Sequence, residues 1–186
     1  MANTTLHHPP FPPLNWRDDG WESNITLAAW SGYSRRFSPE CPRYAKSDGF
    51  NFVIRTKPTP ATPCPIPTSA QTVAFDFLLK SQHAVQSAIL EALLPYYNER
   101  RPDYKAFLGR DFKLLIPKAT NIAVFRELIS PGTIFLHPAE KAGMAYTGFL
   151  FSTCWEVEHG LGFILHGGRV VEIGDAETAF SSRIAE

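Results

Sequence analysis

Hydrophobic residues recur with period two in several stretches of this chain, which places one side of each stretch in a core. The first stretch covers residues 23–30, where Ile25, Leu27 and Ala29 alternate with other residues. The same spacing recurs in residues 49–56, with Phe50, Phe52 and Ile54 on one side, and in residues 132–138. A longer stretch, 143–157, places on one face Phe149, Phe151, Thr153 and Trp155. These patterns predict strands.

Two further β-rich stretches lie close together near the end of the chain. Residues 161–166 and 169–173 flank the dipeptide Gly167-Gly168. A two-residue loop needs backbone conformations that glycine adopts easily, so this spacing predicts a β-hairpin. The segment GDAETAF that follows, residues 174–180, predicts a short capped turn or helix.

Helical spacing dominates the middle of the chain. Residues 68–97 begin with a capping box formed by Thr68 and Gln71, and Pro95 is expected to kink or end the helix. Hydrophobic residues at near-helical spacing predict one long helix here: Ala74, Leu78, Val85, Ile89, Ala92, Leu93 and Tyr96. Residues 120–129 predict a second, short helix, with Ile122, Phe125 and Leu128 three apart.

Together these elements predict an α+β fold: a mainly antiparallel sheet with one long helix packed on a face and a C-terminal β-hairpin. The absence of βαβ alternation excludes a doubly wound sheet. Residues 1–15 predict a Pro-rich N-terminal arm that lies extended on the domain. Residues 16–186 then form a single domain, in which residues 58–67 are a stiff Pro-rich connector.

Charge and composition exclude some classes of function. Lys plus Arg equals Asp plus Glu, at 18 each, so nothing in the net charge draws the protein to nucleic acid or to anionic membranes. No stretch reaches the roughly 18 apolar residues that a membrane-spanning helix needs. The N-terminal residues lack the pattern of a signal peptide, and the three cysteines form no paired framework. We therefore expect a cytoplasmic protein with reduced thiols.

Candidate chemistry gathers in residues 154–166, which hold Cys154, Glu156, Glu158, His159 and His166. Zinc requires three or four converging ligands. Along a strand the cysteine and the two glutamates would share one face, and His159 would point the other way. Since the chain also lacks C-x-x-C and H-E-x-x-H motifs, we expect no metal and no cofactor.

Nucleophilic catalysis is the other chemical reading of this segment. Cys154 could pair with His159 or His166, but a cysteine in an apolar strand usually behaves as a small hydrophobe. Glu158 could instead act with His159 as a general base and its orienting partner. A small enzyme or ligand-binding domain using Glu158 and His159 therefore stays as an alternative to a binding protein.

The C-terminal third resembles a bacterial domain family of unknown function with the pattern W-[DE]-x-E-H-G-[LI]-G, a hairpin, and G-x-[AG]-[DE]-x-[AS]-F. The matching residues are Trp155, Glu156, Glu158, His159, Gly160, Leu161, Gly162, Gly174, Asp175, Ala179 and Phe180. Upstream matches are Asp19, Gly20, Trp21, Trp30, Gly32, Gln71, Ala74 and Tyr97, so the resemblance extends from about residue 16 to residue 180. Departures from the pattern are Glu156, where Asp is more frequent, and the long 58–67 connector.

The resemblance implies a role rather than a chemistry, because the family is similar to small proteins found among bacterial toxin–immunity and accessory genes. It implies a protein that binds and neutralises a cognate toxin or effector encoded nearby, without a cofactor. Such interfaces bury on the order of 1,600 Å² and depend on a few aromatic and arginine anchors. The candidate binding residues are Trp16, Trp21, Trp30, Tyr33, Arg35, Arg36, Glu158 and His159.

Six other residues of the pattern are interpreted as a structural signature: Trp155, Gly160, Gly162, Gly174, Asp175 and Phe180. Glycines at these positions permit tight turns and close backbone approach. A third class of function, an intracellular scaffold module, also fits these observations. The partner and the oligomeric state are left open by the sequence.

Overall fold

The computed structural model describes residues 4–18, 20–35, 49–108, 112–156 and 160–181. Its centre is a sheet of eight strands whose spatial order follows the order of the chain. The strands are β1 (Thr5–Leu6), β2 (Leu14–Arg17), β3 (Gly20–Thr26), β4 (Gly49–Arg55), β5 (Ile129–Lys141), β6 (Met144–Thr153), β7 (Leu161–His166) and β8 (Arg169–Gly174). All neighbouring strands are antiparallel except β4 and β5, which are parallel.

Most helices lie between the two parallel strands in sequence, because a parallel pair needs a long crossover connection. This connection contains α1 (Ser69–Lys80), α2 (Gln82–Leu108), α3 (Phe112–Leu115) and the 3₁₀ helix η3 (Ile122–Glu127). A second 3₁₀ helix, η1 (Ala28–Trp30), follows β3, and α4 (Ala176–Phe180) follows β8. The α+β class and the mainly antiparallel sheet are thus confirmed.

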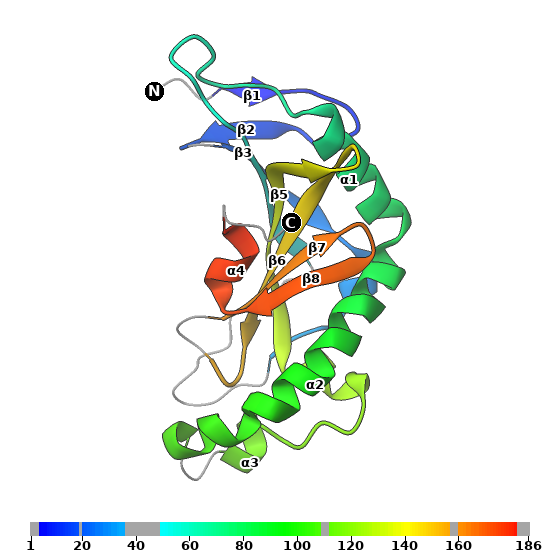
Figure 1. Ribbon diagram of the computed structural model, residues 1–186, viewed down its shortest axis with the longest axis vertical. Helices are drawn as coiled ribbons and strands as arrows, with labels where there is room; N and C mark the ends of the chain where they lie inside the picture. The colour runs from blue at the N-terminus through cyan, green and yellow to red at the C-terminus, as the bar shows by residue number, and fades with distance from the viewer. Residues whose placement is uncertain (1–3, 19, 36–48, 109–111, 157–159, 182–186) are drawn as a thin grey trace.

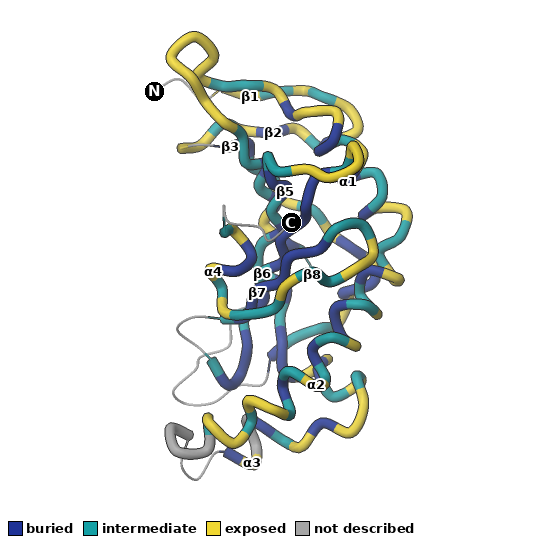
Figure 2. Tube along the Cα trace, in the orientation of Figure 1, coloured by how far each residue is buried: buried dark blue, intermediate teal, exposed yellow. Residues whose placement is uncertain are grey.

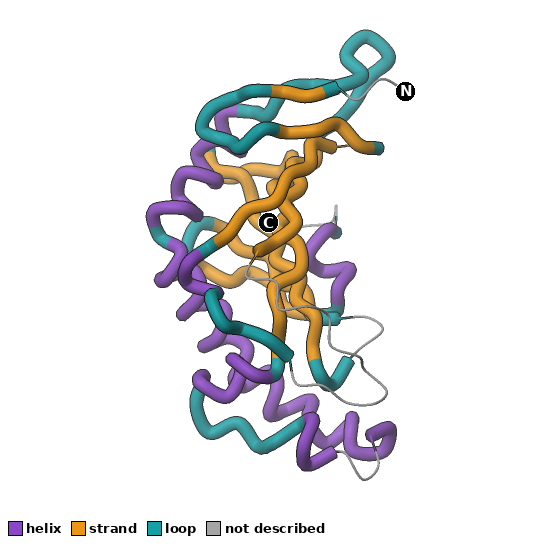
Figure 3. Tube along the Cα trace, turned by 180° about the vertical axis from the view of Figure 1, so that it is seen from behind, coloured by secondary structure: helices purple, strands orange, loops and turns teal. Residues whose placement is uncertain are grey.

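The helices cover both faces of the sheet unequally. Figure 1 shows α1 and α2 along one face and the short α4 against the other, and Figure 3 shows the same arrangement from behind. The larger core lies under α1 and α2, where Phe50, Phe52 and Ile54 of β4 are fully buried together with Phe149 and Phe151 of β6. The predicted faces of these two strands are therefore confirmed, and Figure 2 shows the buried residues along the middle of the sheet.

The prediction of one long helix over 68–97 is wrong in its bounds. Ser81 has non-helical backbone angles, so α1 ends at Lys80 and a separate α2 begins at Gln82. The second helix continues through Pro95 and Pro102 to Leu108. Pro95 and Glu91, whose carbonyl loses its helical partner there, are both exposed, so water can solvate that carbonyl.

Three smaller predictions change in detail. The stretch 23–30 is a strand only to Thr26, after which η1 begins. Residues 120–129 form a 3₁₀ helix rather than an α-helix, which suits the spacing of three between Ile122, Phe125 and Leu128. The expected N-terminal arm contributes β1 to the sheet and buries Phe11 and Leu14.

The predicted hairpin forms between β7 and β8, with Gly167 at a positive φ of 58° in the turn. It is not the last element, because the chain continues directly into α4. Asp175 caps that helix by accepting a hydrogen bond from the Glu177 amide at 3.1 Å. No helix within the described ranges is both long and apolar enough to cross a membrane.

Candidate functional site

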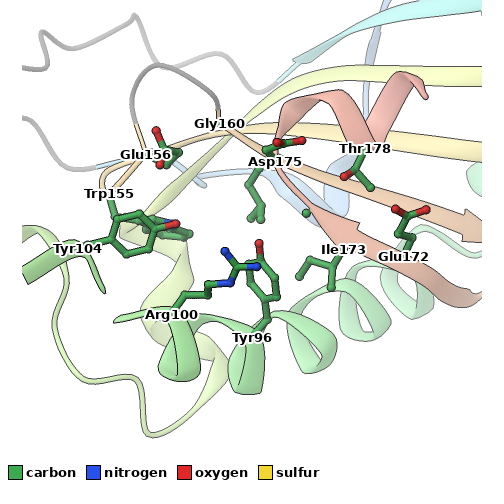
Figure 4. Close-up of a pocket in the computed structure, with 12 residues that line it drawn as sticks. Tyr96, Arg100, Tyr104, Trp155, Glu156, Gly160, Glu172, Ile173, Asp175 and Thr178 are labelled. Atoms are coloured by element: carbon green, nitrogen blue, oxygen red, sulfur yellow. The ribbon is translucent and has the colours of Figure 1, made fainter. Parts of the chain in front are cut away.

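A cleft with a volume of about 440 Å³ lies between α2, β8 and the start of α4 (Figure 4). Five parts of the chain line it: α2, the segment between β6 and β7, the start of β7, strand β8, and α4 with its capping residue. The lining residues are Tyr96, Arg100, Tyr104, Trp155, Glu156, Gly160, Leu161, Glu172, Ile173, Gly174, Asp175 and Thr178. The cleft therefore depends on the docking of both helices against the end of the sheet.

A second cavity, of about 550 Å³, lies beside the first and shares with it Glu172, Asp175 and Thr178. Its other lining residues are Arg55, Glu177, Phe180 and Ser181. These residues come from β4 and from α4, the helix on the opposite face of the sheet from α2. The two cavities thus adjoin each other at β8 and the start of α4.

The α2 wall of the cleft carries aromatic rings and one cation. The guanidinium carbon of Arg100 lies 5.2 Å from the centre of the Tyr96 ring, a cation–π distance. Arg100 forms no ion pair with any residue that the structure describes. Burial, with a smaller contribution from the negative charge of Glu156, raises the pKa of the neighbouring Tyr104. The Tyr104 hydroxyl is therefore neutral at physiological pH and able to donate a hydrogen bond.

Trp155 lines the cleft beside Tyr104 (Figure 4). It stacks edge-on against Tyr97 with ring centres 4.9 Å apart. The Tyr97 hydroxyl donates a 2.7 Å hydrogen bond to the Pro117 carbonyl, which fixes that ring in turn. Directly after β6, the Thr153 hydroxyl accepts from the Glu156 amide at 3.0 Å. The predicted signature residue Trp155 thus has a structural role, and its placement also shapes the cleft.

Residues 157–159, which include Glu158 and His159, lie outside the described residues. Their described neighbours Glu156 and Gly160 both line the cleft, and the Gly160 amide donates a 3.1 Å hydrogen bond to the Glu156 carbonyl. Gly160 has a positive φ of 67°, which suits glycine at this turn. The described ends of the signature loop therefore meet at the rim of the cleft.

The remaining signature residues explain how α4 docks. A Cβ atom at Gly162 would overlap the Asp175 carbonyl, and one at Gly174 would overlap the Thr178 hydroxyl. The helix backbone thus lies directly on the sheet, where no larger side chain fits. Phe180 then packs against Phe135 of β5, with ring centres 5.7 Å apart.

Beneath α4 lies a histidine that the sequence analysis did not single out. His137 of β5 is only 1% exposed, and its Nε2 lies 2.9 Å from the Ala179 carbonyl. Burial is the main cause that lowers the pKa of His137 to about 4, and the nearby charge of Arg55 acts in the same direction. The neutral ring must therefore carry its hydrogen on Nε2, which donates a hydrogen bond to the Ala179 carbonyl of α4.

The aromatic and arginine surface expected near the N-terminus is not an exposed face, which corrects that prediction. Trp21, Trp30 and Arg35 are buried, and Trp16 and Tyr33 are half-buried. The reason is packing: the Trp21 indole donates a 2.8 Å hydrogen bond to Pro65, and Trp30 lies against Phe151.

The expected surface also included two arginines, Arg35 and Arg36. The guanidinium of Arg35 donates a 3.1 Å hydrogen bond to the carbonyl of Thr153, inside the protein. Arg36 lies outside the described residues.

The residues that do line a cleft, Tyr96, Arg100 and Tyr104, were missed because α2 was expected to end near Pro95. Their spacing of four along a helix was the available signal.

The residues that the structure describes form no metal site. Within the described ranges, no group of three or more His, Cys, Asp and Glu side chains could hold a metal ion. Cys154 is buried and directs its Sγ toward the Glu127 carbonyl at 3.6 Å. His166, at the hairpin, places its Nε2 2.9 Å from the Lys141 carbonyl. Neither residue is placed next to the other for thiol catalysis, because His166 lies at the far end of β7.

Comparison with known proteins adds one finding. A family model described as a domain of unknown function, DUF6985, matches residues 21–180. This match agrees with the resemblance to an uncharacterised domain family drawn from the sequence. No curated protein and no solved structure matches the chain significantly.

Proposed function

The chain belongs to the DUF6985 family, whose function is unknown, and we propose that it acts by binding another protein at the cleft between α2, β8 and α4. The observation that supports this proposal is the composition of the cleft. Tyrosine, tryptophan and arginine are the residues that most often dominate the binding energy of protein interfaces. Tyr96, Tyr104 and Arg100 lie together in this one cleft, next to the buried Trp155.

The polarity of the cleft also favours a protein partner. Small-molecule pockets are mostly apolar and enclose their ligand. Here three carboxylates, from Glu156, Glu172 and Asp175, line the cleft together with the Arg100 guanidinium. Charged groups of this kind suit the rim of a protein interface, where they steer encounter and select the partner.

The partner that we propose is a cognate toxin or effector encoded near this chain, which the protein neutralises by direct contact in the cytoplasm. The resemblance to proteins found among toxin–immunity genes supports this choice. In this role the cleft receives a protruding part of the toxin, and the surrounding surface of α2 and α4 completes the interface. No cofactor is needed for that action.

A second candidate is a ligand-binding or enzymatic role for the same cleft, with Glu158 and His159 as the acting pair. The observation that favours it is that Glu156 and Gly160, on either side of residues 157–159, both line the cleft. A carboxylate next to an imidazole is a common general-base arrangement. The His159→Ala and Glu158→Gln variants separate the two candidates, because they should abolish activity or ligand binding in the second and only weaken the protein complex in the first.

Co-expression with the neighbouring gene product tests the first proposal. We expect a stable complex on size exclusion and a nanomolar dissociation constant by calorimetry. Arg100→Ala and Tyr96→Ala should each weaken the complex by about 2 kcal/mol, as hot-spot truncations do. Lys80→Ala, at the exposed end of α1, is the matched control and should leave the affinity unchanged. Absence of a complex, or equal loss in the control, would refute the assignment of this cleft.

A further inference from the structure

Strand β8 is an edge of the sheet with unusual surroundings. Within the described part of the chain it pairs with β7 alone, and the opposite edge, β1, has only two residues. Six residues, Arg169–Gly174, form β8, and all of them are exposed or half-buried. An edge strand presents backbone amide and carbonyl groups that can pair with another chain.

The two cavities described above both border this edge. The cavity next to α2 is lined by Glu172, Ile173 and Gly174 of β8 itself, and the cavity next to α4 is lined by Glu172. Figure 4 shows β8 passing between α2 and α4, with the Glu172 and Ile173 side chains extending from it. Side chains of an added strand would point alternately to the two faces of the sheet, and those next to Glu172 would reach the cavities that it lines.

The charges around the edge indicate which strand fits. The cavity next to α2 is lined by the carboxylates of Glu156, Glu172 and Asp175 and by the Arg100 guanidinium. The cavity next to α4 shares Glu172 and Asp175 with it and adds Glu177 and Arg55, so the two cavities together have four carboxylates against two guanidiniums. The β8 strand of a second copy would bring one glutamate, Glu172, and one arginine, Arg169, so it has no net positive charge to match these carboxylates. An incoming strand with lysine or arginine side chains is the complementary one.

We propose that β8 accepts an extended basic segment of the partner protein as an added strand, whose side chains reach the carboxylates of the two adjoining cavities. This inference rests on the proposed protein-binding function and specifies how the partner docks. Backbone hydrogen bonds to β8 supply affinity, and these carboxylates supply selectivity, as in other cases of strand addition.

A peptide probe tests the inference without the natural partner. A short peptide of alternating lysine and valine, blocked at both ends, is added to the full chain and followed by NMR. We expect shifts and hydrogen-exchange protection at the β8 amides. Glu172→Lys should weaken binding about tenfold, as reversal of a contacting charge does. Glu91→Lys, an exposed charge reversal on α2 away from the cleft lining, should leave binding unchanged.

Two further peptides serve as negative controls, one for backbone pairing and one for charge. A lysine–valine peptide of the same charge that is N-methylated at every residue cannot form the ladder, because it has no backbone amide hydrogen, and should not protect β8. A glutamate–valine peptide should not bind. Equal effects of the N-methylated peptide, protection elsewhere, or no binding of the unmethylated lysine–valine peptide would overturn the proposal.

Hydrogen exchange on the complex with the neighbouring gene product separates the two proposals. A complex that leaves the β8 amides unprotected would overturn strand addition and keep the protein-binding function. Peptide addition to β8 without any protein complex would support the edge and count against the proposed toxin partner.

Discussion

The Nε2 atom of His137 lies 2.9 Å from the carbonyl oxygen of Ala179, so a strand in the middle of the sheet is hydrogen-bonded to the last turn of α4. The same helix begins with Asp175 and contains Thr178, both of which line the cleft. The position of the cleft wall therefore depends on a buried, neutral imidazole. This link couples the acid–base state of one histidine to the stability of the proposed binding region.

Folding stability should fall as the pH is lowered through the window set by His137. The pKa is lowered from 6.5 to about 4 in the folded chain, so the unfolded chain binds more protons between these values. The stabilisation is complete above pH 6.5, is lost progressively as the pH falls, and is gone below pH 4. We expect a loss of about 2 kcal/mol between pH 7.5 and pH 5, measured by urea unfolding.

Two variants identify the source of that pH dependence. His137→Gln should remove most of the slope in this window, because glutamine keeps a hydrogen-bond donor and does not titrate. His137→Asn, which does not titrate either, should remove the slope to the same extent even if its overall stability differs. A wild-type slope in the His137→Gln variant would show that other groups cause it.

The glycines beneath α4 should tolerate no side chain. Gly162→Ala places a Cβ against the backbone of Asp175 and Ala179, which cannot move without displacing the helix. We expect a destabilisation of about 3 kcal/mol in chemical denaturation, the upper range for overpacking. Gly168→Ala is the matched control, because a Cβ there meets only Phe77 at an ordinary contact distance of 3.6 Å.

The Gln71 side chain should contribute more to the free energy of unfolding than is usual for a residue in the first turn of a helix. Its Oε1 accepts from the Thr68 amide at 2.9 Å, which completes the capping box. Its Nε2 donates to the carbonyls of Arg55 at the end of β4 and of Leu136 and His137 within β5. Gln71→Ala should therefore cost about 3 kcal/mol, as loss of a cap together with a buried donor does.

The matched substitution for Gln71→Ala is Val73→Ala, two residues further along α1, where the side chain is 45% exposed. Its free energy of unfolding should change by less than about 0.5 kcal/mol, as is usual for surface positions. Similar losses in the two variants would contradict the bridging role of the Gln71 amide.

Two buried tryptophans should respond differently to the same substitution. The Trp21 indole donates a hydrogen bond to Pro65, whereas the Trp30 indole N–H has no hydrogen-bond partner among the described residues. Trp21→Phe leaves the part-buried Pro65 carbonyl without its donor, while Trp30→Phe removes an unsatisfied donor. We expect Trp21→Phe to be more destabilising by about 1–2 kcal/mol in urea unfolding. The reverse order would show that the Trp30 N–H has a favourable contact.

Much of the sheet could be predicted because alternation and burial coincide. Phe50, Phe52 and Ile54 are spaced two apart and all are fully buried. The length of α2 could not be predicted in this way, since the rule that proline ends a helix fails where the freed carbonyl is solvated. The break at Ser81 also has no signal in the spacing of hydrophobic residues.

The candidate site could be predicted from the sequence less well than the fold. Tryptophan and arginine are favoured both in cores and at interfaces, so residue type alone did not reveal that Trp30 and Arg35 are buried. The cleft is assembled from α2, β8, α4 and the segment after β6, and contacts between such distant elements are set by packing. The glycine signature was recognisable from the sequence, but its reason, the close approach of α4, was not.

The parallel pairing of β4 with β5 has a consequence for how the chain folds. Strands β1–β4 and β5–β8 are two meanders that join through the ladder of residues 51–54 with residues 133–136. Closing that ladder brings together the ends of a long loop, residues 56–128, which carries a large entropic cost and slows folding. The two halves of the sheet are thus expected to form early as local hairpins, and their joining, assisted by the Gln71 amide that spans both strands, to limit the folding rate.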